Sequence, residues 1–233
     1  MKTYTEDFDD GPGGWIKVVD NWSVPAKLPV HDGALWCYGP WWVDYNHAPP
    51  GGGYLQLLAC LNTRGPIGEV PREVGGTNRF VADNFPIDFT NAQFSVRLRG
   101  EVELAGANVC LLLQGIQDGI CSGWVLTGQP ITVTREYSET TLSLVPDEKQ
   151  WTPLGSRHDR RETYGTKPLA RVLANVNVNL YLIMFPVTPK PMGPIQGDPH
   201  LLRAGRDYPI WPSSIAQGYV AVDRVQIEFQ VSR

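Results

Sequence analysis

The strongest constraint on the fold is the periodicity of the apolar residues, because no segment keeps a period of 3.6 over the roughly ten residues that a stable helix needs. Residues 92–104, AQFSVRLRGEVEL, instead alternate with a period of two, so that Phe94, Val96 and Leu98 fall on one face of a strand. The opposite face carries polar side chains: Ser95, Arg97 and Arg99. This alternation predicts an all-β chain.

Turn-forming residues separate the predicted strands, since the chain holds 24 glycines and 20 prolines. Further strand patterns are ANVCLLLQG, GWVLTG, QPITVTREY, TTLSLV, VNVNLYLIMFPV and GYVAVDRVQIEFQV. Short strands joined by such turns predict an antiparallel two-sheet sandwich, with one helical turn near residues 168–176. Two Pro/Gly-rich connections, residues 63–76 and 186–212, exceed the usual loop length and are predicted to be binding loops or lids.

The length of the chain predicts one β-sandwich domain over residues 1–233. A chain of 233 residues with 42% hydrophobic content can bury a large core. We expect Trp15 and Trp151 in that core, because each lies at a strand boundary beside apolar or turn residues.

The charge pattern excludes nucleic-acid binding. The formal net charge is −4, and the 20 Lys and Arg residues are scattered rather than clustered. No apolar run reaches the roughly 20 residues that span a bilayer, so no membrane segment is expected. The N-terminal stretch MKTYTEDFDDG lacks the apolar region of a secretory signal, which favours a cytoplasmic protein unless the chain is a mature secreted fragment.

The four cysteines form no CxxC pair and lie in apolar stretches, so we expect buried free thiols and no zinc site. A disulfide between Cys110 and Cys121 is the alternative if the protein is exported.

Three segments carry a resemblance to a known family: DFDDGPGGW at residues 7–15, YVAVDRVQIEF at 219–229, and TVTREYSETTLSLVPDEKQWTPLG at 132–155. They resemble the jelly-roll carbohydrate-binding modules of the galactose-binding-like type. Concanavalin A-like lectin and glucanase sandwiches begin with a comparable pattern and are the near alternative. Either resemblance implies a jelly-roll-like sandwich and a saccharide ligand.

The first resemblance also implies a structural calcium ion where the first and last strands meet. Glu6 or Asp7, together with Asp223, occupy the matching positions, and calcium prefers such oxygen ligands. The family usually has two acids in the last strand, whereas this chain has Asp223 followed by Arg224. The alternative is an ion pair between Arg224 and an N-terminal acid, with no metal.

The stretch WWVDYNHAPPGGGYL, residues 41–55, has the chemistry of a saccharide platform. Aromatic rings pack on the C–H faces of sugars, and polar side chains bond their hydroxyls. The rings are those of Trp41, Trp42 and Tyr45, and the polar partners are Asp44, Asn46 and His47. Strand alternation places Trp41, Val43 and Tyr45 on one face, so that one face can enter the core while the other meets solvent. A buried aromatic corner is the alternative.

A second polar group, SRHDRRETYG at residues 156–165, supplies Arg157, His158 and Tyr164. Such residues recognise an acidic sugar or serve a polysaccharide lyase, which needs a base and a cation. A salt-bridged surface loop is the alternative. Hydrolase chemistry has weaker support. The pattern nearest to the alternating acids of glucanase-like sandwiches is GEVEL, and its Glu101 and Glu103 are typical of a solvated strand edge.

Three functions therefore stay open. The first is a carbohydrate-binding, lectin-like sandwich; the second is a glycan-active lyase or hydrolase on the same fold; the third is a non-catalytic assembly subunit. No organic cofactor is implied, and homo-oligomerisation is left open.

Overall fold

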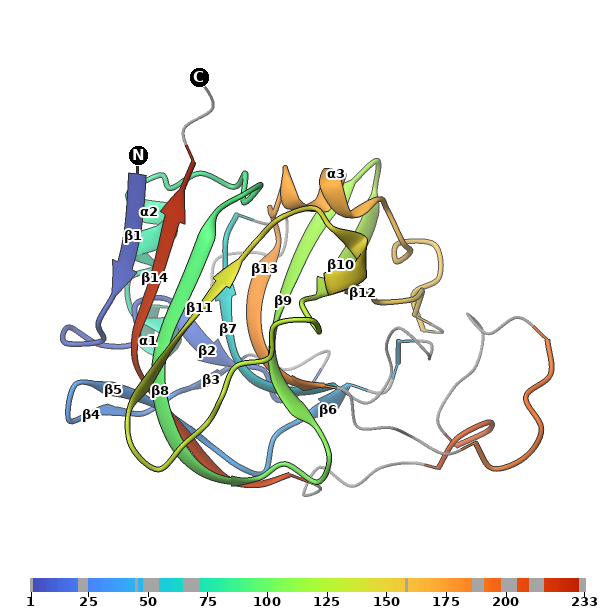
Figure 1. Cartoon of the computed structure of the whole chain (residues 1–233), viewed down its shortest axis with the longest axis horizontal. Coiled ribbons are helices and arrows are strands. Elements are labelled where there is room, and N and C mark those ends of the chain that lie inside the picture. Colours follow the sequence, from blue (N-terminus) through green and yellow to red (C-terminus); the bar gives the residue numbers. More distant parts are fainter. Residues whose placement is uncertain are drawn as a thin grey trace.

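Two antiparallel β-sheets packed face to face form the framework of the fold, as Figure 1 shows. The computed structural model describes residues 2–20, 25–44, 46–47, 55–64, 72–157, 159–185, 191–197, 205–209 and 216–230. The predicted all-β sandwich is confirmed. Most of the two long connections, residues 63–76 and 186–212, lies outside the described residues.

Sheet A is built around the last strand, β14. Within the described residues it contains β1 (Lys2–Glu6), β4 (Val30–His31), β5 (Ala34–Tyr38), β8 (Gln93–Glu103), β11 (Ser138–Ser143) and β14 (Gln217–Phe229). The order is β11-β8-β14-β5-β4, and β1 pairs with the second half of β14 from Lys2↔Phe229 to Glu6↔Val225. The first and last strands therefore lie side by side, as the resemblance implies (Figure 1).

Sheet B forms the second layer. Its described strands are β2 (Trp15–Lys17), β3 (Ala26–Lys27), β6 (Val43–Asp44), β7 (Leu55–Asn62), β9 (Asn108–Gln117), β10 (Ile120–Val125), β12 (Thr152–Pro153) and β13 (Asn179–Phe185). The order is β12-β10-β9-β13-β7-β2-β3, with β6 pairing to β7.

Helices are short and lie between strands. They are α1 (Arg72–Gly75), α2 (Arg79–Ala82), the 3₁₀ turn η1 (Glu148–Gln150) and α3 (Leu169–Leu173). The helix α3 confirms the predicted helical turn near residues 168–176. In the described part of the chain, no helix has the length and apolar character to cross a membrane.

The main core fills the space between the sheets. Phe94, Val96 and Leu98 of β8 are fully buried in it, as their alternation predicts. Trp15 and Trp151 are 0% and 4% exposed, which confirms their predicted burial. The four cysteines are free and buried.

The outer faces of the two sheets differ. The outer face of sheet B carries a second apolar cluster that includes Leu57, Leu112 and Ile183, against which Trp42 packs. The outer face of sheet A instead carries Arg97 and Arg99 together with several aromatic rings. On this second face, aromatic and charged side chains lie together.

Candidate functional site

The predicted platform at residues 41–47 is split between the two sides of sheet B. Trp41 is 0% exposed and lies with Val43 in the main core, so its ring offers no face to a ligand. Trp42 points to the other side and is half-buried against the outer apolar cluster. Strand alternation thus separates the two rings as predicted. Tyr45 and residues 48–54 lie outside the described residues.

The two predicted polar segments do come together, because a backbone bridge joins His47 to Arg157. Arg157 donates from Nη1 to Oδ2 of Asp44 at 2.7 Å and holds both oxygens of Asp159, at 3.0 and 3.1 Å. Tyr164 packs against this group, with its ring 5.7 Å from that of His47 and 5.1 Å from the guanidinium of Arg157. His158 lies outside the described residues.

Burial controls the chemistry of this polar group. Burial lowers the pKa of His47, whose Nδ1 lies 3.0 Å from the carbonyl oxygen of Gly155. Burial alone also lowers the pKa of Arg157, but Asp44 and Asp159 outweigh it and raise that pKa above its usual range. Asp44, His47 and Arg157 are each 4% exposed or less. The group is an interior ion network of one guanidinium and two carboxylates, and it links Asp44 and His47 to Gly155 and Arg157.

A ligand-binding role for Trp42, Asn46 and Tyr164 stays a prediction. Trp42, Asn46 and Tyr164 are half-buried rather than enclosed. Burial raises the pKa of Tyr164 to about 12, so its phenol keeps its proton near neutral pH.

The residues of the implied calcium site do not converge. Glu6 is 0% exposed, and Arg79 donates to both of its oxygens, at 3.1 and 2.5 Å. Gly13, at φ +59°, packs so closely that an added Cβ would lie 1.9 Å from Oε2 of Glu6. Asp7 lies 3.5 Å from the same Arg79.

Asp223 belongs to a different environment, because it sits at a register shift of β14 and pairs with Arg97 at 2.5 Å. Arg97 alternates with the core-facing residues of β8, so this pair lies on the outer face of sheet A, whereas Glu6 is enclosed. The three carboxylates therefore do not fit a shared calcium site. In the part of the chain that the structure describes, no three His, Cys, Asp or Glu side chains gather to hold a metal. The structure also differs from the alternative, an ion pair between Arg224 and an N-terminal acid, because Arg224 pairs with Glu139.

The outer face of sheet A carries a group of residues that the sequence analysis did not single out as a site. We call it the sheet A strip, and it comprises His31, Trp36, Tyr38, Arg97, Arg99, Tyr137 and Tyr219. Register explains their meeting: Tyr38 lies opposite Tyr219, and Tyr219 lies opposite Glu101 in the next strand. One residue pair further along, Trp36 and Arg99 lie on either side of the small Ala221.

The rings of the strip support one another around Trp36. His31 stacks on Trp36 at a centroid distance of 4.5 Å, and Tyr38 stacks at 5.6 Å. Tyr219 lies 5.1 Å from the same ring. Trp36 is itself 8% exposed, whereas Tyr38 is 41% exposed. Trp36 thus acts as a fixed support, and Tyr38 presents aromatic surface to solvent.

Guanidinium groups continue the strip beyond Trp36. Arg99 lies 5.5 Å from the ring of Trp36 and 4.9 Å from that of Tyr137. Arg97 lies 4.9 Å from Tyr137 as well. Such contacts orient a planar guanidinium and hold the ring at low entropic cost.

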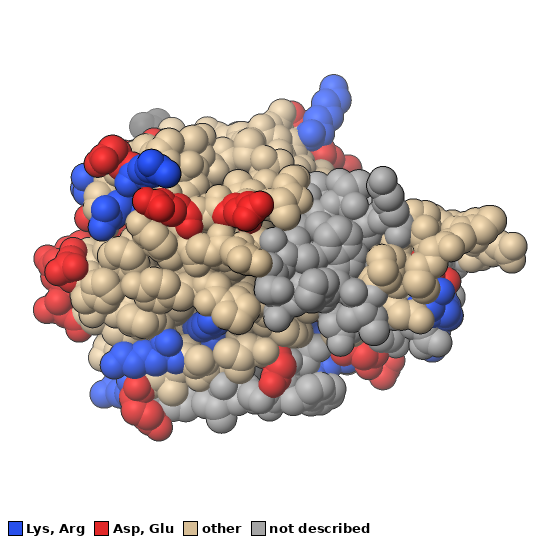
Figure 2. Space-filling model, turned by 90° about the horizontal axis from the view of Figure 1, so that it is seen from below, with Lys and Arg blue, Asp and Glu red and all other residues tan. Residues whose placement is uncertain are grey.

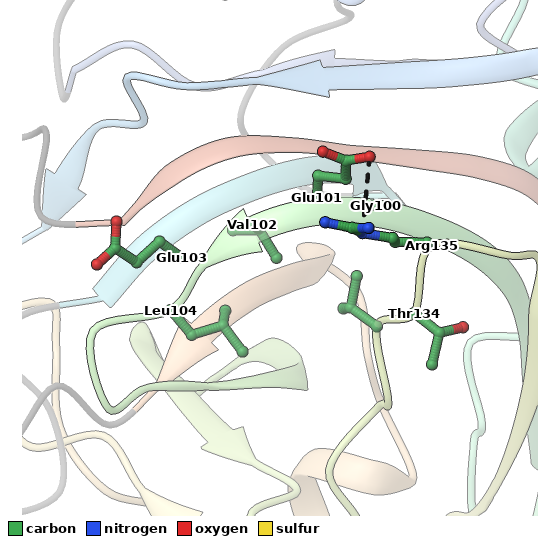
Figure 3. A pocket seen from close by; sticks show the side chains of 8 residues that line it. Gly100, Glu101, Val102, Glu103, Leu104, Thr134 and Arg135 are labelled. Carbon is green, nitrogen blue, oxygen red and sulfur yellow. Dashed lines mark ion pairs between the residues drawn. The ribbon is translucent and has the colours of Figure 1, made fainter.

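A surface pocket of ≈ 410 Å³ adjoins the strip at the end of β8. It is lined by Gly100, Glu101, Val102, Glu103 and Leu104 of β8 and its turn, and by Val133, Thr134 and Arg135. Glu101 points toward Arg135, 3.9 Å away, as Figure 3 shows. The pocket contains the carboxylates of Glu101 and Glu103 and the hydroxyl of Thr134, and such groups can bond hydroxyls of a ligand.

On the face shown in Figure 2, acidic and basic side chains both occur among uncharged side chains, and neither sign forms a large patch. This distribution agrees with the scattered charge pattern of the sequence.

No protein-family model matches the chain. No curated protein matches it either. A solved structure described as "Prominent members of the human gut microbiota express endo-acting O-glycanases to initiate mucin breakdown" aligns with 97% of this chain and 98% of that chain, at 10% identity and a TM-score of 0.40. A likeness this distant assigns no function to the chain.

Proposed function

We propose that this chain is a carbohydrate-binding β-sandwich protein and that the saccharide lies on the sheet A strip. The observation that carries the proposal is the exposed ring of Tyr38, held in place by Trp36 and Tyr219. Sugars present flat C–H faces that pack on such rings, and a ring that is already fixed loses little entropy when a ligand binds.

The polar groups of the strip supply the second requirement. Saccharide hydroxyls need donors and acceptors at the edges of the ring platform. His31 and Tyr38 lie 3.4 Å apart through Nε2 and Oη, and Glu101 is available from the adjoining pocket. The strip therefore offers apolar faces and hydrogen-bonding edges on one rigid sheet.

A binding function fits this geometry better than catalysis by the buried network. His47 is 3% exposed and its neighbours are charge-compensated, so it has the surroundings of a structural residue rather than of a general base. Strip residues act here as binding contacts, and no reaction step is assigned to them.

The proposal is tested with a glycan array followed by calorimetric titration of the saccharide that binds. Tyr38→Ala should weaken binding by about 1 kcal/mol, roughly fivefold in Kd, because it removes one ring contact from an exposed position. Val19→Ala, which truncates another exposed apolar side chain, is the matched control and should leave Kd unchanged.

Two results would count against the proposal. One is an array on which the folded protein binds no saccharide. The other is a Tyr38→Ala protein that binds as tightly as the wild type.

A further inference from the structure

Arg99 differs from the other arginines on its face of sheet A. Arg97 is paired with Asp223, and Arg224 is paired with Glu139. Among the described residues, Arg99 makes no ion pair, and its Nε is buried without a hydrogen-bond partner. The guanidinium charge of Arg99 therefore has no carboxylate at ion-pair distance among the described residues, although the charge of Glu136 acts on it.

A ligand can meet the guanidinium of Arg99 only through its Nη groups, because its Nε has almost no accessible surface. The two flanking rings, Trp36 and Tyr137, fix the plane of the guanidinium, and the side chain of Tyr137 is also a hydrogen-bond partner of Arg99. A planar, oriented guanidinium matches the oxygens of a carboxylate or a sulfate, which bond it through two parallel hydrogen bonds.

We infer that the strip takes an acidic saccharide, with its carboxylate or sulfate on Arg99 and a sugar ring against Tyr38. The inference rests on the proposed function and adds the chemical class of the ligand. The distance along the sheet is suitable, because Arg99 and Tyr38 belong to neighbouring rows of one face, with Trp36 next to both.

The acids around Arg99 leave room for an anion. Asp223 and Glu139 are held by Arg97 and Arg224, and Glu101 lies toward Arg135. Glu136 is exposed, and its charge acts on Arg99. It is the acid that an incoming anion would meet, so its removal should favour binding.

The experiment uses matched glycans on an array and in titrations: one neutral backbone, the same backbone with a uronate, and the same backbone with a sulfate. The wild type should bind at least one acidic form at least tenfold more tightly than the neutral form. Arg99→Gln should remove this preference, so that the acidic form binds no more tightly than the neutral form. The two acidic forms tell a carboxylate ligand from a sulfate ligand.

Two further variants separate a specific contact from general charge. Arg224→Gln removes the same charge from the same face but from an existing ion pair, and it should keep most of the preference. Glu136→Gln should increase affinity for the acidic form. Melting curves of all variants show whether each protein is folded.

The outcomes distinguish the inference from the proposal on which it rests. Equal binding of neutral and acidic forms by the wild type overturns the inference but leaves saccharide binding intact. Equal losses in Arg99→Gln and Arg224→Gln overturn the specific role of Arg99. Binding of no saccharide at all overturns both.

Discussion

Replacing Arg79 by Ala tests how the chain terminus is held against the sandwich. The substitution removes two hydrogen bonds to Glu6 and leaves that fully buried carboxylate with one bond, from the backbone N–H of Phe8 at 3.2 Å. Loss of one partner of a buried ion pair costs about 3–5 kcal/mol. The Arg79 side chain is 35% exposed, so water can replace part of the lost contact, and we take the lower end, about 3 kcal/mol.

Thermal unfolding followed by circular dichroism measures this cost. A loss of about 3 kcal/mol corresponds to a fall in Tm of about 6–12 °C for a chain of this size. Arg135→Ala is the control, because its pair with Glu101 spans 3.9 Å between exposed side chains and is worth at most about 1 kcal/mol. An Arg79→Ala protein that melts with the control would refute the reasoning.

Two further predictions concern proton and metal binding. Burial lowers the pKa of His47 in the folded protein, so the unfolded chain takes up this proton first as the pH falls. The stability from neutral His47 is therefore present above about pH 6.5 and decreases below it, by at most about 1.4 kcal/mol per pH unit. Denaturant titrations at pH 7 and 5 should show a smaller change for His47→Gln than for wild type, and equal changes would contradict the assignment. Because Glu6, Asp7 and Asp223 do not converge, chelator should leave Tm unchanged, and a calcium-dependent rise in Tm that Asp223→Ala removes would contradict that geometry.

Much of the fold could be predicted because strand alternation is a local signal. Phe94, Val96 and Leu98 face the core because strand side chains repeat with a period of two. The same alternation places the neighbouring residues Trp41 and Trp42 on opposite sides of sheet B. The meeting of the first and last strands followed from the resemblance of their sequences.

The sheet A strip was missed because its members come from separate strands. The spacing of Trp36 and Tyr38 indicates that they share a face, as does the spacing of Arg97 and Arg99. Only the order of β8, β14 and β5 brings the two pairs together, and strand order depends on long-range pairing that a local pattern does not contain. The sequence instead predicted a saccharide platform at the aromatic segment 41–55, although Trp41 lies inside the core.

Mapping the saccharide on the protein by NMR tests the central claim most directly. The indole N–H of Trp36 donates to the carbonyl of His31 beneath the strip, whereas that of Trp41 is buried in the core. Titration with the saccharide found on the array should shift the Trp36 indole resonance and the amide resonances of β5, and leave the Trp41 indole resonance in place. Shifts confined to residues 41–47 and 155–164, with Trp36 unaffected, would contradict binding on sheet A.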